Sequence, residues 1–182
     1  ILAFEGNPEK LDIKSISPQL SEYKIEHQPK SDTVNIWFND AQNKFDAKAT
    51  TQLEFSYDTS KKQDTVRLYY KPVKDEFKIE NKGGNLLVPN QDFKITANLP
   101  LQSIDTKDWK LESDSMAVNF KAKISEKNPY ERLVSADFKP TKKYALTVIK
   151  GSVKSYFEGI VKSYKFEFQA DKSENYGGFV IK

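Results

Sequence analysis

The feature that most constrains the fold of this chain is a series of short runs in which apolar and polar residues alternate. In residues 53–57 (Leu-Glu-Phe-Ser-Tyr) and 164–168 (Tyr-Lys-Phe-Glu-Phe), every second residue is aromatic or aliphatic. This period of two is typical of a strand with one face on a core and the other in water. The same pattern predicts strands at residues 23–26, 33–38, 65–70, 93–97, 116–124 and 144–149.

The composition favours strands as well. Twelve Phe, nine Tyr and two Trp stand against a single Met, and aromatic residues make up 13% of the 182 residues. Flat rings and β-branched side chains pack well on pleated, half-buried surfaces. Because many short strands follow one another with turn residues between them, we predict an all-β, mostly antiparallel fold of sandwich modules.

A pair of glycines, Gly83 and Gly84, suggests a boundary between two modules. Paired glycines offer no side chain for packing and lose backbone entropy when ordered, so they favour turns or linkers. We therefore predict a module at residues 1–80 and a second at residues 81–182. The first is small for a free-standing domain, so it is either the truncated part of a larger domain or supported by the second.

Residues 32–38 (Asp-Thr-Val-Asn-Ile-Trp-Phe) are echoed 32 positions later by residues 64–70 (Asp-Thr-Val-Arg-Leu-Tyr-Tyr). In both, Asp-Thr stands where a chain leaves a turn, and β-branched Thr begins an extended run. Two interpretations remain open. The two segments are equivalent strands of one sheet, or the echo reflects only the residues that strands commonly share.

Strand alternation gives the echoed segments two faces. Adjacent strand residues point to opposite sides, so a buried set of Val34, Ile36, Phe38, Val66, Leu68 and Tyr70 implies that Trp37 and Tyr69 face outward, the latter beside Arg67. The candidate interaction surface is therefore Trp37, Tyr69 and Arg67. Such a surface stacks on a sugar or a peptide, or packs against the neighbouring module.

The charge pattern excludes some classes of partner. Lys and Arg number 29 against 26 Asp and Glu, which gives a net charge of +3, and the two signs are interleaved along the chain. No basic run is longer than a pair, so we expect no nucleic-acid partner. No apolar run approaches the roughly 18 residues of a membrane span. Membrane attachment is expected only through a lipid anchor outside this sequence.

Three stretches of the second half form a recognisable set: residues 99–105 (Leu-Pro-Leu-Gln-Ser-Ile-Asp), 139–148 (Lys-Pro-Thr-Lys-Lys-Tyr-Ala-Leu-Thr-Val) and 149–153 (Ile-Lys-Gly-Ser-Val). Through them, residues 85–182 resemble the bacterial Ig-like domains of Bacteroidota envelope lipoproteins; residues 1–80 resemble what precedes such a domain only weakly. Two departures are Ser155 in place of the usual Asp and Lys150 where Pro is common. The resemblance implies two tandem Ig-like β-sandwich modules in an exported protein, located in the periplasm or on the outer-membrane surface of a Gram-negative bacterium.

One residue within the resembling segment carries a specific structural expectation. A Tyr that opens a late strand of such a sandwich often bonds back to nearby backbone. Tyr144 is our candidate for this corner. Its strand has apolar residues on both faces, with Tyr144, Leu146 and Val148 alternating with Ala145, Thr147 and Ile149, and it is predicted to be central.

The sequence offers no recognisable catalytic or metal-binding motif. There are no cysteines, so disulfides, thiolate metal sites and cysteine nucleophiles are excluded. The only histidine, His27, has no neighbouring carboxylate pair and is interpreted as a surface residue. An acidic cluster of Asp105, Asp108, Glu112 and Asp114 matches no calcium-loop spacing and is interpreted as solvated turn residues. We therefore expect no metal and no cofactor.

These observations predict a non-enzymatic structural or interaction module of an exported envelope protein or lipoprotein, which acts as a spacer or contacts a protein partner. A carbohydrate-binding module that uses exposed aromatic residues is the alternative, with a glycan as its ligand. A hydrolase whose site lies outside this sequence is a third possibility.

Overall fold

A computed structural model describes residues 2–3, 13–17, 19–27, 32–39, 43, 50–57, 63–69 and 76–176. Of residues 2, 13–17, 50–57 and 63–69, only the backbone is described. Among the described residues, strands are the predominant secondary structure. All described strand pairs but one are antiparallel, so the all-β, mostly antiparallel fold that the alternating runs predict is confirmed.

The chain divides into two compact units, Ile1–Asp75 and Glu76–Lys182. The sequence-based division after residue 80 assigns β7 (Ile79–Glu80) to the first module, but β7 pairs with β9 (Phe93–Ala97) of the second unit. Gly83 and Gly84 lie inside the second unit, between β7 and the next strand.

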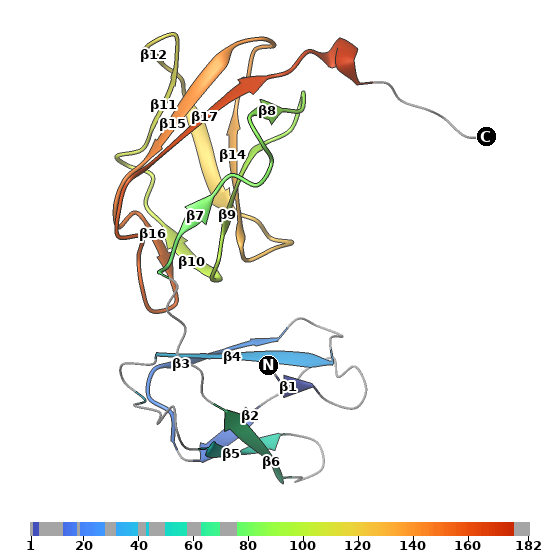
Figure 1. Cartoon of the computed structure of the whole chain (residues 1–182), viewed down its shortest axis with the longest axis vertical. Helices are drawn as coiled ribbons and strands as arrows, with labels where there is room; N and C mark the ends of the chain where they lie inside the picture. Colours follow the sequence, from blue (N-terminus) through green and yellow to red (C-terminus); the bar gives the residue numbers. More distant parts are fainter. Residues whose placement is uncertain are drawn as a thin grey trace, which may run out of the picture. The chain divides into compact units, whose positions relative to one another are not determined.

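The first unit contains two three-stranded antiparallel sheets (Figure 1), with the orders β1-β4-β3 and β2-β5-β6. The echoed segments 32–38 and 64–70 therefore contribute β4 and β6 to different sheets, and the interpretation as equivalent strands of one sheet is wrong. Each pairs with its neighbour along the chain, β4 with β3 and β6 with β5. The bounds are β1 (Leu2–Ala3), β2 (Ile13–Ser17), β3 (Tyr23–His27), β4 (Thr33–Phe38), β5 (Thr50–Tyr57) and β6 (Gln63–Tyr69).

The second unit is a sandwich of a four-stranded sheet, β13-β14-β9-β7, and a five-stranded sheet, β12-β11-β15-β17-β8. A two-stranded sheet pairs β10 with β16. The remaining bounds are β8 (Leu86–Leu87), β10 (Leu101–Ile104), β11 (Lys110–Ser113), β12 (Met116–Ala117), β13 (Phe120–Ile124), β14 (Glu131–Ala136), β15 (Lys143–Val148), β16 (Val153–Ser155) and β17 (Tyr164–Ala170), followed by a single 3-10 turn, η1 (Ser173–Asn175).

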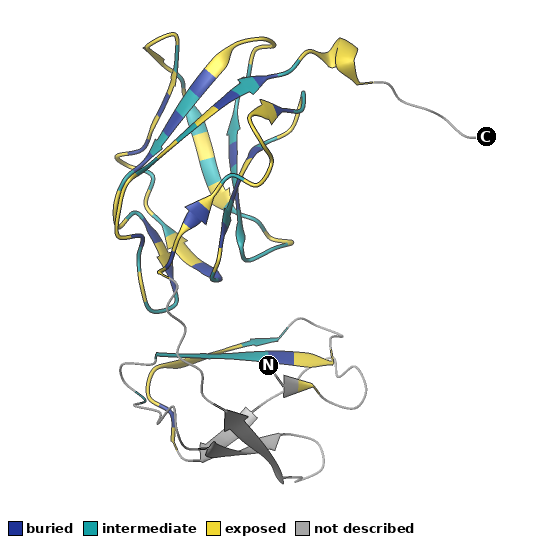
Figure 2. Ribbon diagram, in the orientation of Figure 1, coloured by how far each residue is buried: buried dark blue, intermediate teal, exposed yellow. Residues whose placement is uncertain are grey.

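The core of the second unit lies between its two large sheets, where every second residue along the strands points inward and is buried (Figure 2). Phe93 and Phe168, one from each sheet, stack with their ring centroids 3.9 Å apart. Phe138 meets Phe168 and Tyr144 edge-on, at centroid distances of 5.5 and 5.0 Å. The two edge-on pairs are of the kind that adds stability beyond the area that they bury.

β15 is the central strand of the five-stranded sheet, as its apolar faces predict. It pairs with β11 on one side and with β17 on the other, both antiparallel. Tyr144, Leu146 and Val148 are buried, while Ala145 and Thr147 on the opposite face are half-buried.

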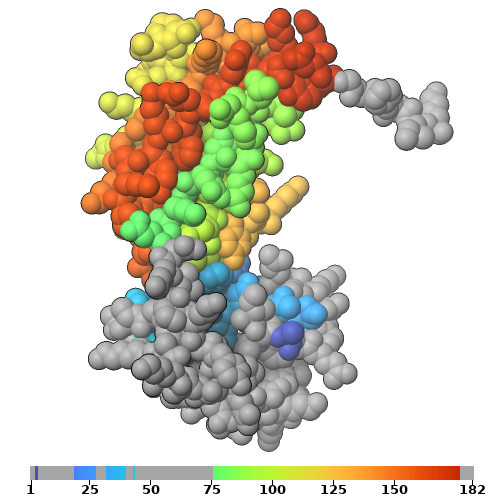
Figure 3. All heavy atoms as spheres, viewed as in Figure 1, coloured from blue at the N-terminus to red at the C-terminus, as the bar shows by residue number. Residues whose placement is uncertain are grey.

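Between β7 and β8 the chain passes from one sheet of the second unit to the other, at the glycine pair Gly83 and Gly84. β7 belongs to the four-stranded sheet, whereas β8 runs parallel to β17 in the five-stranded sheet. Gly84 has a φ of 76°, which side chains disfavour, and the Asn81 side chain holds the turn by donating to the carbonyl of Gly84 at 2.7 Å. In the space-filling view, the segment that carries β7 and β8 (green) lies directly beside β17 (red) (Figure 3).

Candidate functional site

The predicted interaction surface is not assembled on one sheet. Arg67 and Tyr69 lie in β6, and Trp37 lies in β4 of the other sheet of the first unit. The side chains of Arg67 and Tyr69, and Tyr70 altogether, lie outside the described residues. Sequence similarity of the two segments therefore did not reveal their pairing, because strand pairing depends on residues elsewhere in the chain.

Trp37 lies on the face of β4 opposite Val34, but Ile36 and Phe38 on the Val34 face are half-buried just as Trp37 is, so their burial does not separate the two faces as predicted. Its direct cross-strand partner is Lys24, and its indole Nε1 donates to the Glu26 carboxylate at 3.0 Å. Val34, on the opposite face of β4, is fully buried. Trp37 itself is half-buried and hydrogen-bonded, so it is a less open platform than the sequence suggested.

The acidic cluster is spread over turns and a strand. Asp105 accepts a bond from the backbone N–H of Lys107 at 3.1 Å, and Asp114 pairs with Lys142 at 2.7 Å. Glu112 lies in β11. Within the part of the chain that the structure describes, no three carboxylate or histidine groups are arranged to hold a metal ion.

A shallow groove of about 550 Å³ lies on the outer face of the five-stranded sheet. Ala145 of β15 stands between Glu112 of β11 and Glu167 of β17 in one cross-strand row. Because the Ala145 side chain is small, the surface is lower there than at the longer side chains of Glu112 and Glu167, and Ala145 forms the bottom of the groove. The rim at one end is Leu86 of β8, whose side chain is 57% exposed.

Lysines neutralise part of this groove. Lys165 of β17 bonds Glu167 at 2.7 Å, and both side chains are well exposed. The hydrogen bond and the charge of Glu167 raise the pKa of Lys165, with a smaller contribution from Glu112, and Lys165 in turn lowers the pKa of Glu167. The groove thus presents both signs of charge together with an exposed apolar side chain.

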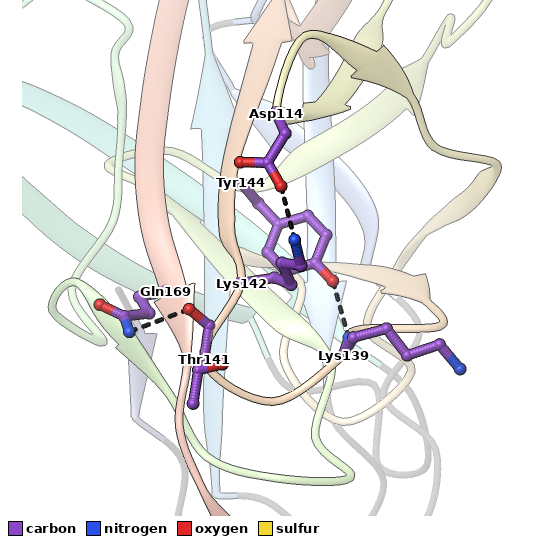
Figure 4. A network of polar contacts seen from close by, with 6 residues as sticks. All are labelled: Asp114, Lys139, Thr141, Lys142, Tyr144 and Gln169. Atoms are coloured by element: carbon purple, nitrogen blue, oxygen red, sulfur yellow. Dashed lines mark hydrogen bonds and ion pairs between the residues drawn. The ribbon is translucent and has the colours of Figure 1, made fainter.

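A polar network at one end of the groove fixes the loop that enters β15 (Figure 4). The Tyr144 hydroxyl accepts the backbone N–H of Lys139 at 2.7 Å, five residues upstream. The predicted tyrosine corner is therefore confirmed. The Lys142 N–H donates to the Lys139 carbonyl at 3.3 Å, and with Pro140 second and Thr141 third at a φ of 66° this is a type II turn.

Two further bonds hold Thr141 in a backbone conformation that is unusual for a β-branched residue. Its N–H donates to the Ala170 carbonyl at 2.7 Å, and its carbonyl accepts the side-chain amide of Gln169 at 3.1 Å (Figure 4). Both partners belong to β17. The corner thereby ties the loop before β15 to the neighbouring strand.

The hairpin from β11 to β12 forms the rim opposite Leu86. Asp114 and Ser115 have φ values of 50° and 64°, as a two-residue turn between Ser113 and Met116 requires. The ion pair of Asp114 with Lys142 joins this hairpin to the corner loop, and both side chains are half exposed. The sequence signal for this hairpin was the pair Asp114-Ser115. In the sequence analysis, Asp114 was considered only as a member of the acidic cluster.

Loss of the Tyr144 hydroxyl is expected to destabilise the second unit. Tyr144→Phe keeps the buried ring but leaves the Lys139 N–H without its acceptor, so we expect a loss of about 1–2 kcal/mol. Trp37 and Trp109 lie in different units; in a Trp37→Phe background, Trp109 fluorescence during denaturant unfolding reports the second unit. Tyr164→Phe on β17 is the control, with a change under about 0.5 kcal/mol. Equal losses in both variants would contradict a special role for the corner.

Sequence reasoning missed one buried charge. Arg132 of β14 points into the core with 1% of its surface exposed, and no described residue accepts a hydrogen bond from its Nε, Nη1 or Nη2. Its guanidinium carbon lies 5.2 Å from the centre of the Trp109 ring, while the indole Nε1 donates to the Ser152 hydroxyl at 2.7 Å. Loss of hydration lowers the pKa of Arg132 to about 10.

Comparisons of the chain with protein-family models, with curated proteins and with solved structures gave no match. None of the described segments forms a helix that is long and apolar enough to cross a membrane. The functional assignment accordingly rests on the residues and their geometry.

Proposed function

We propose that this chain is a non-enzymatic interaction module of an exported bacterial envelope protein or lipoprotein, built on an Ig-like sandwich. The proposed setting is the periplasm or outer-membrane surface of a Gram-negative bacterium, and it rests on the sequence resemblance. In this setting the second unit contacts a protein partner, and the tandem arrangement serves as a spacer.

The strand order of the second unit supports the Ig-like assignment. Immunoglobulin domains place their strands A, B, E and D in one sheet, with C, F and G in the other. Here β7, β9, β14 and β13 are neighbours in one sheet, and β11, β15 and β17 are neighbours in the other. The corner at Tyr144 and the buried Trp109, which immediately precedes β11, agree with the features of that fold.

The observation that carries the interaction role is the groove over β11, β15 and β17. It combines exposed Leu86 with carboxylates and ammonium groups on a rigid, fully paired sheet. Carboxylate and ammonium groups line the centre of the groove and Leu86 lies at one end, so a protein partner of complementary charge can pair with both signs there. A carbohydrate site would instead be expected to offer an exposed aromatic ring, and among the described lining residues Tyr144 and Phe168 are both buried.

The groove is tested by site-specific photo-crosslinking in the native host. A photoreactive residue replaces exposed Lys143, which lines the groove, or exposed Lys154 of β16, which does not. We expect one discrete protein adduct in the envelope fraction from position 143 and none from position 154, identified by mass spectrometry. The charge reversal Glu167→Lys should lower the yield of that adduct at least several-fold, because the introduced lysine repels a cationic group of the partner that the glutamate attracts.

Two results would contradict the proposal. Adducts of equal yield from both positions would show non-specific contact, and a specific adduct found only in the cytosolic fraction would exclude the envelope setting. A panel of glycans titrated while tryptophan fluorescence is followed distinguishes the carbohydrate alternative. A saturable change that Trp37→Phe abolishes would favour a glycan ligand over a protein partner.

A further inference from the structure

The edges of the two large sheets in the second unit are unequal. Three of the four edge strands, β7, β8 and β12, are only two residues long. The fourth, β13, has five residues and pairs with β14 in unbroken register over its whole length. Very short edge strands are one way in which proteins avoid unwanted pairing. β13 is not shortened in this way.

Three residues of β13 direct their backbone N–H and C=O groups away from the neighbouring strand β14. The Ser125 N–H donates to the Glu131 carbonyl at 2.9 Å, which sets the direction of alternate peptide groups along this pair. Lys123 and Lys121 lie two and four residues before Ser125, so their N–H and C=O groups also point toward β14. The N–H and C=O groups of Phe120, Ala122 and Ile124 consequently point outward from the edge.

The side chains of β13 differ sharply between its two faces. Phe120, Ala122 and Ile124 pack against the core and remain half-buried, with β10 as a further neighbour of β13. Lys121 and Lys123 are exposed on the outer face. The edge is therefore apolar on one side and basic on the other.

A further lysine extends the basic side. Leu133 of β14 pairs with both Lys123 and Lys94 of β9, which places the two lysines on the same outer face. Lys123 forms an ion pair with Glu126 at 3.6 Å, in which the side chains are 62% and 88% exposed. Such exposed pairs contribute little, so Glu126 does not prevent Lys123 from pairing with an incoming carboxylate.

We propose that β13 is a docking edge for an extended segment of a partner protein that has acidic residues at alternate positions and apolar residues between them. The segment adds as a further strand and bonds the outward backbone groups of Phe120, Ala122 and Ile124. Its apolar side chains cover the half-buried residues, and its carboxylates lie opposite Lys121 and Lys123. Strand addition derives affinity from main-chain bonds and specificity from alternate side chains.

This edge goes beyond the groove function, since the groove lies on the other sheet. The two sites therefore fail or succeed independently. Variants of β13 test only the edge, and variants at Glu167 test only the groove.

The probe is a synthetic peptide, acetyl-Gly-Val-Glu-Val-Glu-Val-Gly-amide, titrated into the ¹⁵N-labelled full chain. The matched control replaces both glutamates by lysines. We expect saturable shifts of the amide resonances of Phe120, Ala122 and Ile124, and about tenfold tighter binding of the acidic peptide, because two cross-strand charge pairs change sign. The same three amides should exchange with solvent faster than those of Lys121 and Lys123 in the free protein and become protected on binding.

Charge reversal gives the sharpest variant. Lys121→Glu with Lys123→Glu changes only exposed side chains, and the preference should then reverse so that the basic peptide binds more tightly. Ala122→Pro removes an outward N–H while it leaves the bonds to β14 in place, a position that an edge strand tolerates. It should abolish binding of both peptides with an unchanged circular dichroism spectrum. If Ala122→Pro does not fold, the charge reversal decides alone.

Three outcomes would overturn the proposal. The first is the absence of saturable shifts at the β13 amides at millimolar peptide. The second is a preference for the acidic peptide that persists after charge reversal. The third is concentration-dependent shifts of the same amides without peptide, which would show that a second copy of the chain occupies the edge.

Discussion

Replacing Arg132 by leucine is expected to raise the free energy of unfolding of the second unit by about 1–4 kcal/mol, since apolar replacements of buried ionic groups often stabilise by this amount. The guanidinium is 1% exposed and its three nitrogens lack an acceptor among the described residues. Its contact with the Trp109 ring offsets only part of that cost, because a desolvated cation–π contact contributes about 2 kcal/mol. Leucine keeps the apolar contact and removes the charge.

The measurement is denaturant unfolding in the Trp37→Phe background, followed at Trp109. Arg132→Lys, which keeps the charge but loses the planar group that lies over the ring, should be less stable than the wild type. Lys123→Leu on neighbouring β13 changes an exposed lysine in the same way and should shift stability by less than about 0.5 kcal/mol. A loss of stability in Arg132→Leu would mean that the guanidinium has an acceptor in solution.

The stabilisation should also depend on pH. Because burial lowers the pKa of Arg132 to about 10, the guanidinium is charged in both the folded and the unfolded chain below that pH. Above about pH 10, and up to the higher pKa of a hydrated arginine, the unfolded chain binds one more proton than the folded chain, so the wild type gains stability as the pH rises. The difference between wild type and Arg132→Leu should hence be constant around neutrality and narrow above about pH 10.

Leu146→Ala is expected to lower the free energy of unfolding of the second unit by about 2–5 kcal/mol, the range found when a buried leucine is truncated. Leu146 is fully buried in the middle of β15, with Leu111 and Phe166 as its cross-strand neighbours. Removing its side chain leaves a cavity in the core between the two sheets, which the paired strands around it cannot fill without disturbing their hydrogen bonds.

Thr147→Ala is the matched control, because it lies next to Leu146 on the outer face of the same strand and is only half-buried. We expect a change of less than about 1 kcal/mol, read from the same Trp109 unfolding curves. Comparable losses at the two positions would contradict the face assignment of β15. A loss confined to Leu146 would support it.

The strands that the sequence predicts well are those in which alternation extends over several residues. β15 and β17 have this pattern, and Tyr144 could be assigned to a corner because a single residue type has a defined role there. The two-residue strands β7 and β8 were not predicted, since two residues cannot show a period. The glycine pair was interpreted as a module boundary, but it lies inside the second unit, where it connects β7 of one sheet to β8 of the other.

The candidate sites depend on contacts between distant residues, which alternation alone does not determine. Trp37 and Tyr69 were expected on one sheet because their segments share residue types, whereas pairing followed the nearest hairpin partners. The groove depends on Ala145 standing between Glu112 and Glu167, which are 55 positions apart. Arg132 and Leu133 are adjacent in β14 and point to opposite faces of the sheet. The sequence allows either of them to face the core, and only the structure shows that it is the arginine.

The parallel pairing of β8 with β17 has a consequence for mechanical strength. These strands belong to the first and last parts of the second unit, and they run in the same direction. A pull that draws the two ends of the unit apart therefore loads the bonds from Gln169 to Asn85 and from Asp171 to Leu87 together, in shear. Bonds loaded together resist force better than bonds that open one at a time. We therefore expect this short pair of strands to contribute to the resistance of the second unit to stretching.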